Sequence, residues 1–259
     1  MTYQDKVVLV TGGAKGVGRG ISECYLAAGA TVVVCGRSAP ENAADLPQAA
    51  GQTAEFVACD VRDLASCQAL IDGIVAKHGR LDVLVNNAGG APFTDAATAS
   101  PRFHEKIFAL NLTAPFALSQ MANKVMQVQA GGGVVVFVGS ISALRPSPGT
   151  AAYGAAKAGV LSLVQSLAVE WAPKVRLVSV SPGPVRTEQA HLHFGDEAGI
   201  AAVGKTIPLG RMAEPSDIGN ACVYLSSAQA AYISGVNLTV HGGGERPAFL
   251  DAANVKHDA

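Results

Sequence analysis

A tyrosine and a lysine four residues apart, Tyr153 and Lys157, are the side chains in this sequence best suited to proton-transfer chemistry. Residues at positions i and i+4 of a helix lie on one face, so these two side chains can meet there. A free tyrosine has a pKa of about 10 and is a poor general acid or base at neutral pH. Because a nearby ammonium favours the phenolate, we expect Lys157 to lower the pKa of Tyr153 by about 1–3 units, toward the range in which acid–base catalysis is efficient.

Ser140 precedes this pair and follows an apolar run at residues 133–138. A short apolar run of this kind predicts a buried strand, which places Ser140 at the carboxyl end of that strand. The Tyr-x-x-x-Lys spacing alone is a weak signal, since a chain with five tyrosines produces it by chance on ordinary helix surfaces. The chemical interpretation therefore depends on the elements and motifs around it.

Short apolar runs rich in β-branched residues alternate with helical patterns along the whole chain. Runs of this kind are typical of strands buried on both faces, and their alternation with helices predicts a parallel, doubly wound sheet. The expected strands are residues 6–11, 31–35, 54–58, 81–85, 134–138, 176–180 and 236–240, and the expected helices are one ending at Ala28 and residues 64–77, 102–129, 152–171 and 216–225. Without a linker or repeat, the sequence predicts one Rossmann-type α/β domain, residues 1–259, in three α/β/α layers.

A glycine-rich turn joins the first expected strand to the first expected helix. It reads Gly12-Gly13-Ala14-Lys15-Gly16-Val17-Gly18. Free backbone N–H groups and the helix dipole at such a turn bind phosphate groups. The pattern G-x-x-x-G-x-G is weak by itself, but its place between a strand and a helix favours a dinucleotide site.

The residues that end the second expected strand indicate which dinucleotide is bound. An acidic side chain there would bond the ribose 2′-OH of NAD, whereas an arginine accommodates a 2′-phosphate. The chain has Arg37 and Ser38 at this point and no acid, and Lys15 could reach the same phosphate. The sequence therefore predicts NADP(H), with NAD(H) as the alternative if both cations are solvated surface residues.

Composition limits the classes of function. The chain is 49% hydrophobic and 15% charged, with a net charge of −1, which indicates an ordered protein and gives no electrostatic case for nucleic acid or an anionic membrane surface. Its five cysteines are scattered, as is typical of reduced core thiols. We find no signal peptide and no apolar run near the roughly 18 residues of a membrane helix, so we expect a soluble, cytoplasmic protein.

Taken together, these motifs resemble those of the short-chain dehydrogenase/reductases, in their single-domain branch. The resemblance spans nearly the whole chain and implies interconversion of a secondary alcohol and a ketone with NAD(P)(H). The motifs that carry it are Thr11 to Gly18, Asn86-Asn87-Ala88-Gly89, Asn111, Ser140, Tyr153-x-x-x-Lys157, Pro182-Gly183-Pro184-Val185-Arg186-Thr187 and the closing residues 232–243.

The resemblance implies a catalytic tetrad. Tyr153 would exchange a proton with the substrate oxygen, and Ser140 would hydrogen-bond the same oxygen and stabilise charge that develops there. Lys157 would lower the pKa of Tyr153 and bond the nicotinamide ribose. Asn111 would hold a water in a proton relay to Lys157.

The resemblance also implies a cofactor-binding set. Asp60 would bond the adenine amino group, the Asn87 segment would let the ribose approach the backbone, and Val185 and Thr187 would bind the nicotinamide carboxamide. The full expected set is Gly12, Lys15, Gly16, Val17, Gly18, Arg37, Ser38, Asp60, Val61, Asn87, Ala88, Gly89, Tyr153, Lys157, Pro182, Gly183, Val185 and Thr187.

Residues 188–207 correspond to a mobile lid over the substrate in this family. Its small and apolar residues favour a hydrophobic ketone or secondary alcohol, such as an acyl-chain, alicyclic or steroid-like compound. The lid contains His191 and His193, but without a third ligand at a recognisable spacing we expect no metal site.

Two other activities remain as alternatives. A reductase of carrier-protein-bound 3-oxoacyl groups would dock an acidic partner through basic residues near the ends of the two long helices, where residues 124–132 offer Lys124 alone and residues 166–170 offer none. A non-catalytic nucleotide-sensing protein on the same fold tends to lack the tyrosine or the lysine, and both are present here.

The long helices also predict self-association. Their apolar residues surround much of the circumference, which suggests a second buried face and, with the resemblance, a homotetramer or homodimer. These residues are Phe108, Leu112, Phe116, Met121, Val160, Leu163, Val164 and Leu167. The alternative is that all of them pack on the sheet. The tail, residues 244–259, extends past the usual end of the family, and we hypothesise that it reaches a neighbour's active site.

Overall fold

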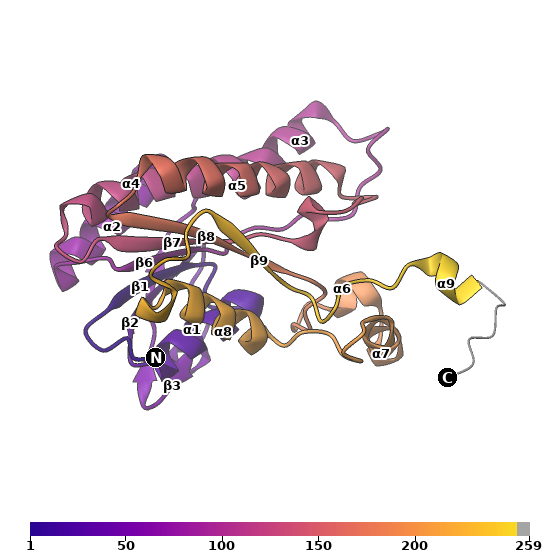
Figure 1. Ribbon diagram of the computed structural model, residues 1–259, viewed down its shortest axis with the longest axis horizontal. Helices are drawn as coiled ribbons and strands as arrows, with labels where there is room; N and C mark the ends of the chain where they lie inside the picture. The colour runs from indigo at the N-terminus through magenta and orange to yellow at the C-terminus, as the bar shows by residue number, and fades with distance from the viewer. Residues whose placement is uncertain (253–259) are drawn as a thin grey trace.

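Seven parallel strands form one sheet, whose order is β5-β2-β1-β6-β7-β8-β9. The computed structural model describes residues 1–252 (Figure 1). The strands are β1 (Val7–Thr11), β2 (Thr31–Gly36), β5 (Glu55–Ala58), β6 (Val83–Asn86), β7 (Gly133–Val138), β8 (Val175–Pro182) and β9 (Val236–Val240). All seven expected strands are confirmed, with bounds that shift by one or two residues. An unexpected antiparallel pair, β3 (Gln48–Ala49) and β4 (Gln52–Thr53), precedes β5.

Helices cover both faces of the sheet (Figure 1). Helices α2 (Leu64–His78), α4 (Ala114–Val128) and α5 (Ala151–Glu170) lie on one face, and α1 (Gly16–Ala27) and α8 (Pro215–Ser226) lie on the other. Side chains alternate between the two faces along each strand. In β1, Leu9 packs into the core shared with α2, α4 and α5, and Val8 and Val10 pack into the core shared with α1 and α8. This confirms the doubly wound, three-layer α/β/α architecture.

The expected continuous helix at residues 102–129 is interrupted. It consists of α3 (Pro101–Phe108), a π-helical segment (Ala109–Thr113) and α4. Pro115 lacks an N–H and cannot donate to the carbonyl of Asn111 four residues earlier, so the regular hydrogen-bond pattern of an α-helix is interrupted at this point. A π-helical turn commonly marks such a discontinuity. The segment holds Asn111 fully buried beneath the sheet's carboxyl edge.

Helix α5 is long and apolar enough, by length and composition, to cross a membrane, and it is the one such helix within residues 1–252. Core helices of soluble proteins pass the same test. Here Val160, Val164 and Leu167 are buried in the core cluster that includes Phe137 and Leu177 of the sheet. We therefore assign α5 as a core helix.

The burial of these residues also tests the second apolar face that we expect on the long helices for contact with another subunit. Val160, Val164 and Leu167 pack on the sheet, so these three are not free to contact another subunit. The other five expected residues are only partly buried. They are Phe108, Leu112, Phe116, Met121 and Leu163.

The segment that we expect to form a lid follows β8. It contains α6 (His191–Phe194) and α7 (Glu197–Thr206), held by a small cluster of Ala190, Ile200, Ile207 and Met212. The last described helix, α9 (Ala248–Ala252), extends away from the body of the protein (Figure 1). The expected tail begins with an ion pair, Glu245 to Arg145 at 2.7 Å, and its residues 253–259 lie outside the described residues. Single 3-10 turns occur at Ala43–Asp45, Ile141–Ala143 and Ala228–Ala230.

Candidate active site

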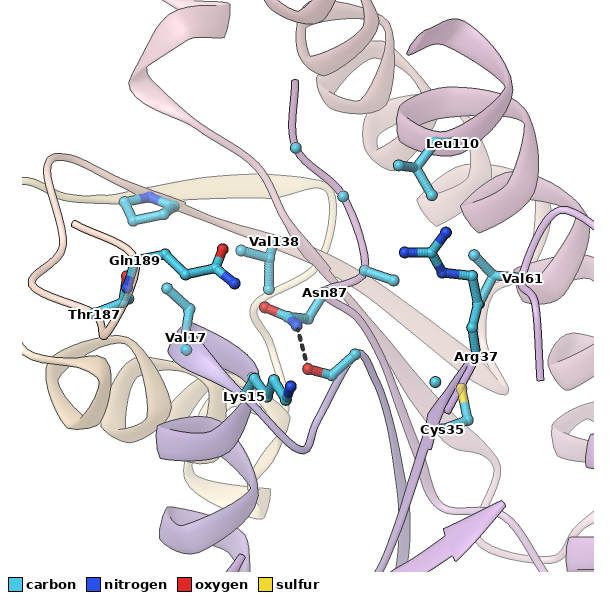
Figure 2. A pocket seen from close by; sticks show the side chains of 18 of the residues that line it. Lys15, Val17, Cys35, Arg37, Val61, Asn87, Leu110, Val138, Thr187 and Gln189 are labelled. Atoms are coloured by element: carbon cyan, nitrogen blue, oxygen red, sulfur yellow. Dashed lines mark hydrogen bonds between the residues drawn. The ribbon is translucent and has the colours of Figure 1, made fainter. Parts of the chain in front are cut away.

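A cavity of about 640 Å³ lies at the carboxyl ends of the strands. The chain winds outward from β1 toward β5 and then from β6 toward β9, so the direction of winding reverses between β1 and β6. Ligands of open α/β sheets bind at such a reversal. The glycine turn after β1 and the Asn87 segment after β6 both line the cavity (Figure 2).

Backbone geometry at the glycine turn fits a phosphate group. Gly12 and Gly16 have φ values of +62° and +53°, which favour glycine, and a Cβ at Gly18 would collide with the carbonyl oxygen of Gly12. The Lys15 side chain makes no capping hydrogen bond at the start of α1, and the first turn of α1 lines the cavity. An anion is stabilised by amides in this position. The residues present therefore fit a dinucleotide.

Two strand ends are tied together beside this turn. The side chain of Asn87 donates to the carbonyl oxygens of Thr11 at 2.9 Å and Gly12 at 3.3 Å (Figure 2). The Thr11 hydroxyl in turn accepts from the backbone N–H groups of Asn87 at 3.0 Å and Ala88 at 2.9 Å. These bonds explain how Asn87 and Ala88 are held against the cavity wall.

Two cations reach the cavity from different elements. Lys15 on the turn before α1 and Arg37 after β2 are exposed and line the cavity, with Val61 beside Arg37 (Figure 2). Asp60 also lines the cavity, but its carboxylate is paired with Arg62, whose Nη2 and Nε lie 2.6 Å and 3.0 Å from its oxygens. The Arg62 hydrogen bonds lower the pKa of Asp60 to about 2. Asp60 is therefore an anion already engaged by a neighbour.

The ionisation of Tyr153 differs from the sequence expectation. Burial raises the pKa of Tyr153 above its usual value, and a hydrogen bond with the Ser140 side chain acts in the opposite direction. The prediction that Lys157 lowers this pKa is wrong for the protein alone. The Lys157 ammonium lies 5.6 Å from the centre of the Tyr153 ring and donates to the Val138 carbonyl at 2.7 Å.

Lys157 is itself perturbed by its surroundings. Its side chain is buried, and desolvation lowers its pKa to about 8. A lysine with a pKa of about 8 is deprotonated to a larger extent near neutral pH than an ordinary lysine. Tyr153 and Lys157 both line the cavity, and Ser140 follows Val138 and Gly139, which also line it.

Asn111 is connected to this site through the loop after β6. Its side-chain amide donates to the carbonyls of Gly90 at 3.0 Å and Ile107 at 2.9 Å, and its oxygen accepts from the Gly90 N–H at 2.8 Å. A Cβ at Gly89 would lie 2.7 Å from the Asn111 oxygen and 3.4 Å from the Lys157 nitrogen. The Asn111 side chain thus holds Gly90 of the cavity wall through one donor and its oxygen, and its other donor bonds back to Ile107 in the preceding helical turn.

Most of the expected cofactor residues line the cavity, and three do not. Ser38, Gly183 and Val185 are absent from its lining. The sequence prediction missed other lining residues. They are Cys35, Gly36, Cys59, Arg62, Gly90, Leu110, Val138, Gly139, Glu188, Gln189 and His193.

The side of the cavity formed by the lid is more polar than expected. Glu188, Gln189 and His193 line the cavity, whereas Ile200 packs inside the lid's own cluster and Leu192 is 69% exposed. Sequence reasoning missed this because the apolar composition of residues 188–207 does not say which side chains face inward. The strand-end residues Cys35, Cys59 and Val138 were predictable from their position at the carboxyl edge.

Comparison with known proteins identifies the family. A family model described as enoyl-(acyl carrier protein) reductase matches residues 12–245. The chain is 38% identical to D-threitol dehydrogenase of Mycolicibacterium smegmatis, over 92% of each chain, and 35% identical to 3alpha-hydroxysteroid dehydrogenase of Mediterraneibacter gnavus, over 93% of this chain and 98% of the other. A solved structure of a putative short-chain alcohol dehydrogenase from Sinorhizobium meliloti 1021 superposes with a TM-score of 0.86 at 32% identity, covering 93% of this chain and 97% of the other. The chain therefore belongs to the short-chain dehydrogenase/reductase family of NAD(P)-dependent oxidoreductases, as its motifs predict.

Proposed function

We propose that this protein interconverts a secondary alcohol and a ketone, with NADP(H) as the preferred cofactor and Tyr153 as the general acid and base. The observation that carries the proposal is the shared cavity. Tyr153 and Lys157 line the same cavity as Gly12, Lys15 and Gly16, so a dinucleotide held at the glycine turn can extend to the tyrosine.

The chain's own residues supply the proton chemistry. NADPH, when bound, supplies the hydride that reduces the carbonyl carbon. The Ser140 hydroxyl would hydrogen-bond the substrate oxygen, and the Tyr153 hydroxyl would donate its proton to that oxygen as negative charge develops there. Lys157 would bond the nicotinamide ribose and favour the tyrosinate left behind, once the ribose draws its ammonium toward the cavity. Asn111 holds Gly90, which forms part of the cavity wall, through two hydrogen bonds.

The cofactor preference rests on charge at the adenosine end. Arg37 and Lys15 are exposed cations on the cavity rim, and the residue after β2 is an arginine rather than an acid. A ribose 2′-phosphate would receive charge-assisted hydrogen bonds from both. NAD(H) is the alternative if neither cation contacts the cofactor. Preference for NADP(H) would favour reduction as the working direction.

The substrate class has two candidates. An apolar ketone or alcohol is favoured by Phe93 and Leu144, which are 78% and 54% exposed on the segments that follow β6 and β7. A polyol or sugar-like substrate is favoured by the polar lining residues Gln189 and His193 and by the similarity to D-threitol dehydrogenase. A carrier-protein-bound 3-oxoacyl group is less well supported than these two candidates. Its acidic carrier protein would need basic residues to dock on, and the exposed Lys124 is the one basic residue of α4.

The assembly and the location are also part of the proposal. We propose a homotetramer or homodimer, supported by the partly exposed Leu112, Phe116 and Met121 along the π-helical segment and α4. We propose a cytoplasmic location, supported by five free cysteines and no disulfide among them. Sedimentation at micromolar concentration tests the assembly, and a monomer alone would refute it.

A parallel assay tests the function. Consumption of NADPH and of NADH is followed by absorbance with two panels, one of alicyclic and steroid ketones and one of ketoses. We expect turnover with NADPH and little with NADH, and the reactive panel identifies the substrate class. Turnover with NADH alone would overturn the cofactor preference. If the protein binds either cofactor but turns over no compound of either panel, the result would favour a nucleotide-sensing protein.

A further inference from the structure

A serine of β8, Ser181, lies beside the segment that leads into the expected catalytic serine. Val138 pairs with Val180 in the register of β7 and β8, and the Gly139 N–H donates to the Val180 carbonyl at 2.8 Å. The next position of each chain therefore brings Gly139 opposite Ser181. Since Ser140 follows Gly139 directly, the Ser181 side chain lies next to the backbone that carries Ser140.

Ser181 and Gly139 are in close contact. The Ser181 side chain is fully buried, and a Cβ at position 139 would collide with its Oγ. Gly139 does not have a positive φ, so the close approach of the hydroxyl, rather than the backbone conformation, requires a glycine here. The Ser181 hydroxyl thus supports the backbone from within the core.

This backbone holds two of the expected catalytic side chains. The Val138 carbonyl accepts from the Lys157 ammonium at 2.7 Å, which is the one hydrogen bond of this buried lysine within residues 1–252. Figure 2 shows Val138 on the cavity wall. Ser140 begins the next turn, where its hydroxyl oxygen accepts from the Ser142 N–H at 3.1 Å. A shift of the backbone at Gly139 would therefore move Ser140 and the acceptor of Lys157 together.

The edge strand fixes Ser181 in turn. The Ser181 hydroxyl donates to Oδ1 of Asn237 at 2.7 Å, and Asn237 is a partly buried residue of β9, the last strand of the sheet. An amide oxygen only accepts, so this bond sets the direction of the hydroxyl hydrogen and holds the serine side chain in one orientation. Asn237 and Ser181 thus connect β9 to the segment before Ser140.

Ser179 provides a contrast on the same strand. It lies two residues before Ser181, on the same face, and is fully buried. A Cβ at position 139 would lie 3.0 Å from the Ser179 Oγ, so both serines adjoin Gly139. Unlike Ser181, Ser179 has no hydrogen-bond partner for its hydroxyl within residues 1–252. The two serines therefore separate simple packing beside Gly139 from packing that a hydrogen bond fixes.

We propose that Ser181, held by Asn237, is a positioning residue that fixes the backbone at Gly139 and thereby places Ser140 and Lys157 for the reaction. Neither Ser181 nor Asn237 is part of the cavity lining, so their effect passes through this backbone. The inference rests on the proposed function, in which Ser140 bonds the substrate oxygen and Lys157 bonds the ribose. Small displacements of such groups slow a reaction strongly, because catalysis depends on their exact orientation.

Steady-state kinetics with the ketone that the parallel assay selects test the effect on turnover. We expect Ser181→Ala to lower kcat by about tenfold or more, with the KM of the ketone and the NADP⁺ dissociation constant within about threefold of the wild type. The matched control, Ser179→Ala, should keep its kcat within about twofold, because removal of an unpartnered hydroxyl costs little. Cofactor titration counts the folded sites, and kcat is expressed per site. An unchanged kcat in Ser181→Ala, or equal losses in the two variants, would overturn the proposal.

Variants of Asn237 test the hydrogen bond itself. Asn237→Leu removes the acceptor and should reproduce the kcat loss of Ser181→Ala, whereas Asn237→Asp keeps an acceptor oxygen and should retain most of kcat. The double variant of Ser181→Ala and Asn237→Leu should lose no more than the larger single loss, because both changes act through one contact. Losses that multiply, or equal losses in Asn237→Asp and Asn237→Leu, would overturn the proposal. If Ser181→Ala does not fold, the two Asn237 variants decide.

A titration without substrate separates this proposal from the proposed function. NMR of protein labelled with ¹⁵N-lysine follows the Lys157 ammonium between pH 6 and pH 10, and Lys157→Met assigns its signal. A displaced Val138 carbonyl would bond the ammonium less well, so we expect the pKa of Lys157 to fall from about 8 by about 0.5 in Ser181→Ala and to stay unchanged in Ser179→Ala. An unchanged pKa in Ser181→Ala would overturn the positioning role. Wild-type protein that turns over no ketone would contradict the proposed function, and this titration would still decide whether Ser181 positions Lys157.

Discussion

The carboxylate of Glu188 accepts a hydrogen bond at 3.0 Å from the backbone N–H of Gly16. Glu188 is an exposed residue of the segment that leads into the lid, and Gly16 is the first residue of α1. This amide is one of those that would bind a cofactor phosphate. An anionic side chain of the lid thus occupies the position that suits the anion of the ligand.

Replacing Glu188 is expected to tighten cofactor binding. Glu188→Gln removes a negative charge that competes for the N-terminal end of α1, and charges at helix ends are worth about 0.3–1 kcal/mol, or about two- to fivefold in affinity. Titration of cofactor fluorescence measures the dissociation constant. Glu197→Gln is the control, since Glu197 pairs with Arg186 at 2.9 Å on the same lid. Weaker binding by Glu188→Gln would contradict the competition.

Tyr153→Phe is expected to abolish turnover and leave cofactor affinity unchanged. The substitution keeps the ring that lies 5.6 Å from the Lys157 ammonium and removes the hydroxyl that carries the proton, which is typically worth about 10²–10⁴ in rate. Steady-state kinetics and cofactor titration separate the two effects. Tyr232→Phe, at a fully exposed tyrosine, should behave as the wild type. Retention of more than a tenth of kcat would argue against Tyr153 as the acid.

Arg37→Ala is expected to lower affinity for NADPH and to leave that for NADH nearly unchanged. A hydrogen bond to a charged group is worth about 1.5–3 kcal/mol, which corresponds to about 10- to 160-fold in the dissociation constant. Arg102→Ala, at an exposed arginine of α3, removes the same charge away from the cavity and should have no effect. Equal losses for the two cofactors would place Arg37 outside the 2′-phosphate site.

Burial of Lys157 is expected to make folding stability rise with pH between about 8 and 10.5. In this window the unfolded lysine still binds a proton, whereas the folded one, with a pKa of about 8, has lost it. The unfolded state therefore holds more protons, and stability increases with pH by up to about 3 kcal/mol.

Urea unfolding at several pH values tests this contribution. Lys157→Met should flatten the dependence over that window relative to the wild type, and Lys124→Met, at an exposed lysine, should leave it unchanged. An identical slope in Lys157→Met and the wild type would show that Lys157 does not lose its proton on folding.

The strands and the residues at their carboxyl ends could be predicted from the sequence. Continuous β-branched runs such as 7–11 are buried on both faces, and the residues that follow parallel strands, including Arg37, Asn87 and Ser140, must gather at one edge. Position in the chain alone places them near the cavity.

Features that depend on packing could not be predicted in this way. The inward direction of Glu188 and His193 depends on how the lid's small core folds, and the π-helical turn around Asn111 depends on one proline inside a helical pattern. The ionisation of Tyr153 depends on its burial and on where the Lys157 ammonium points. None of these is a periodic property of the sequence.

Hydride transfer itself is the most direct test of the proposed activity. NADPH deuterated at C4 of the nicotinamide is mixed with the ketone that the parallel assay selects, and the alcohol product is examined by mass spectrometry. The proposed activity predicts one deuterium on the carbinol carbon with the wild type and at most traces with Tyr153→Phe. The experiment is run with each of the two C4-deuterated epimers of NADPH. An alcohol that carries no deuterium with either epimer, or an equal amount of product from Tyr153→Phe, would contradict the proposed activity.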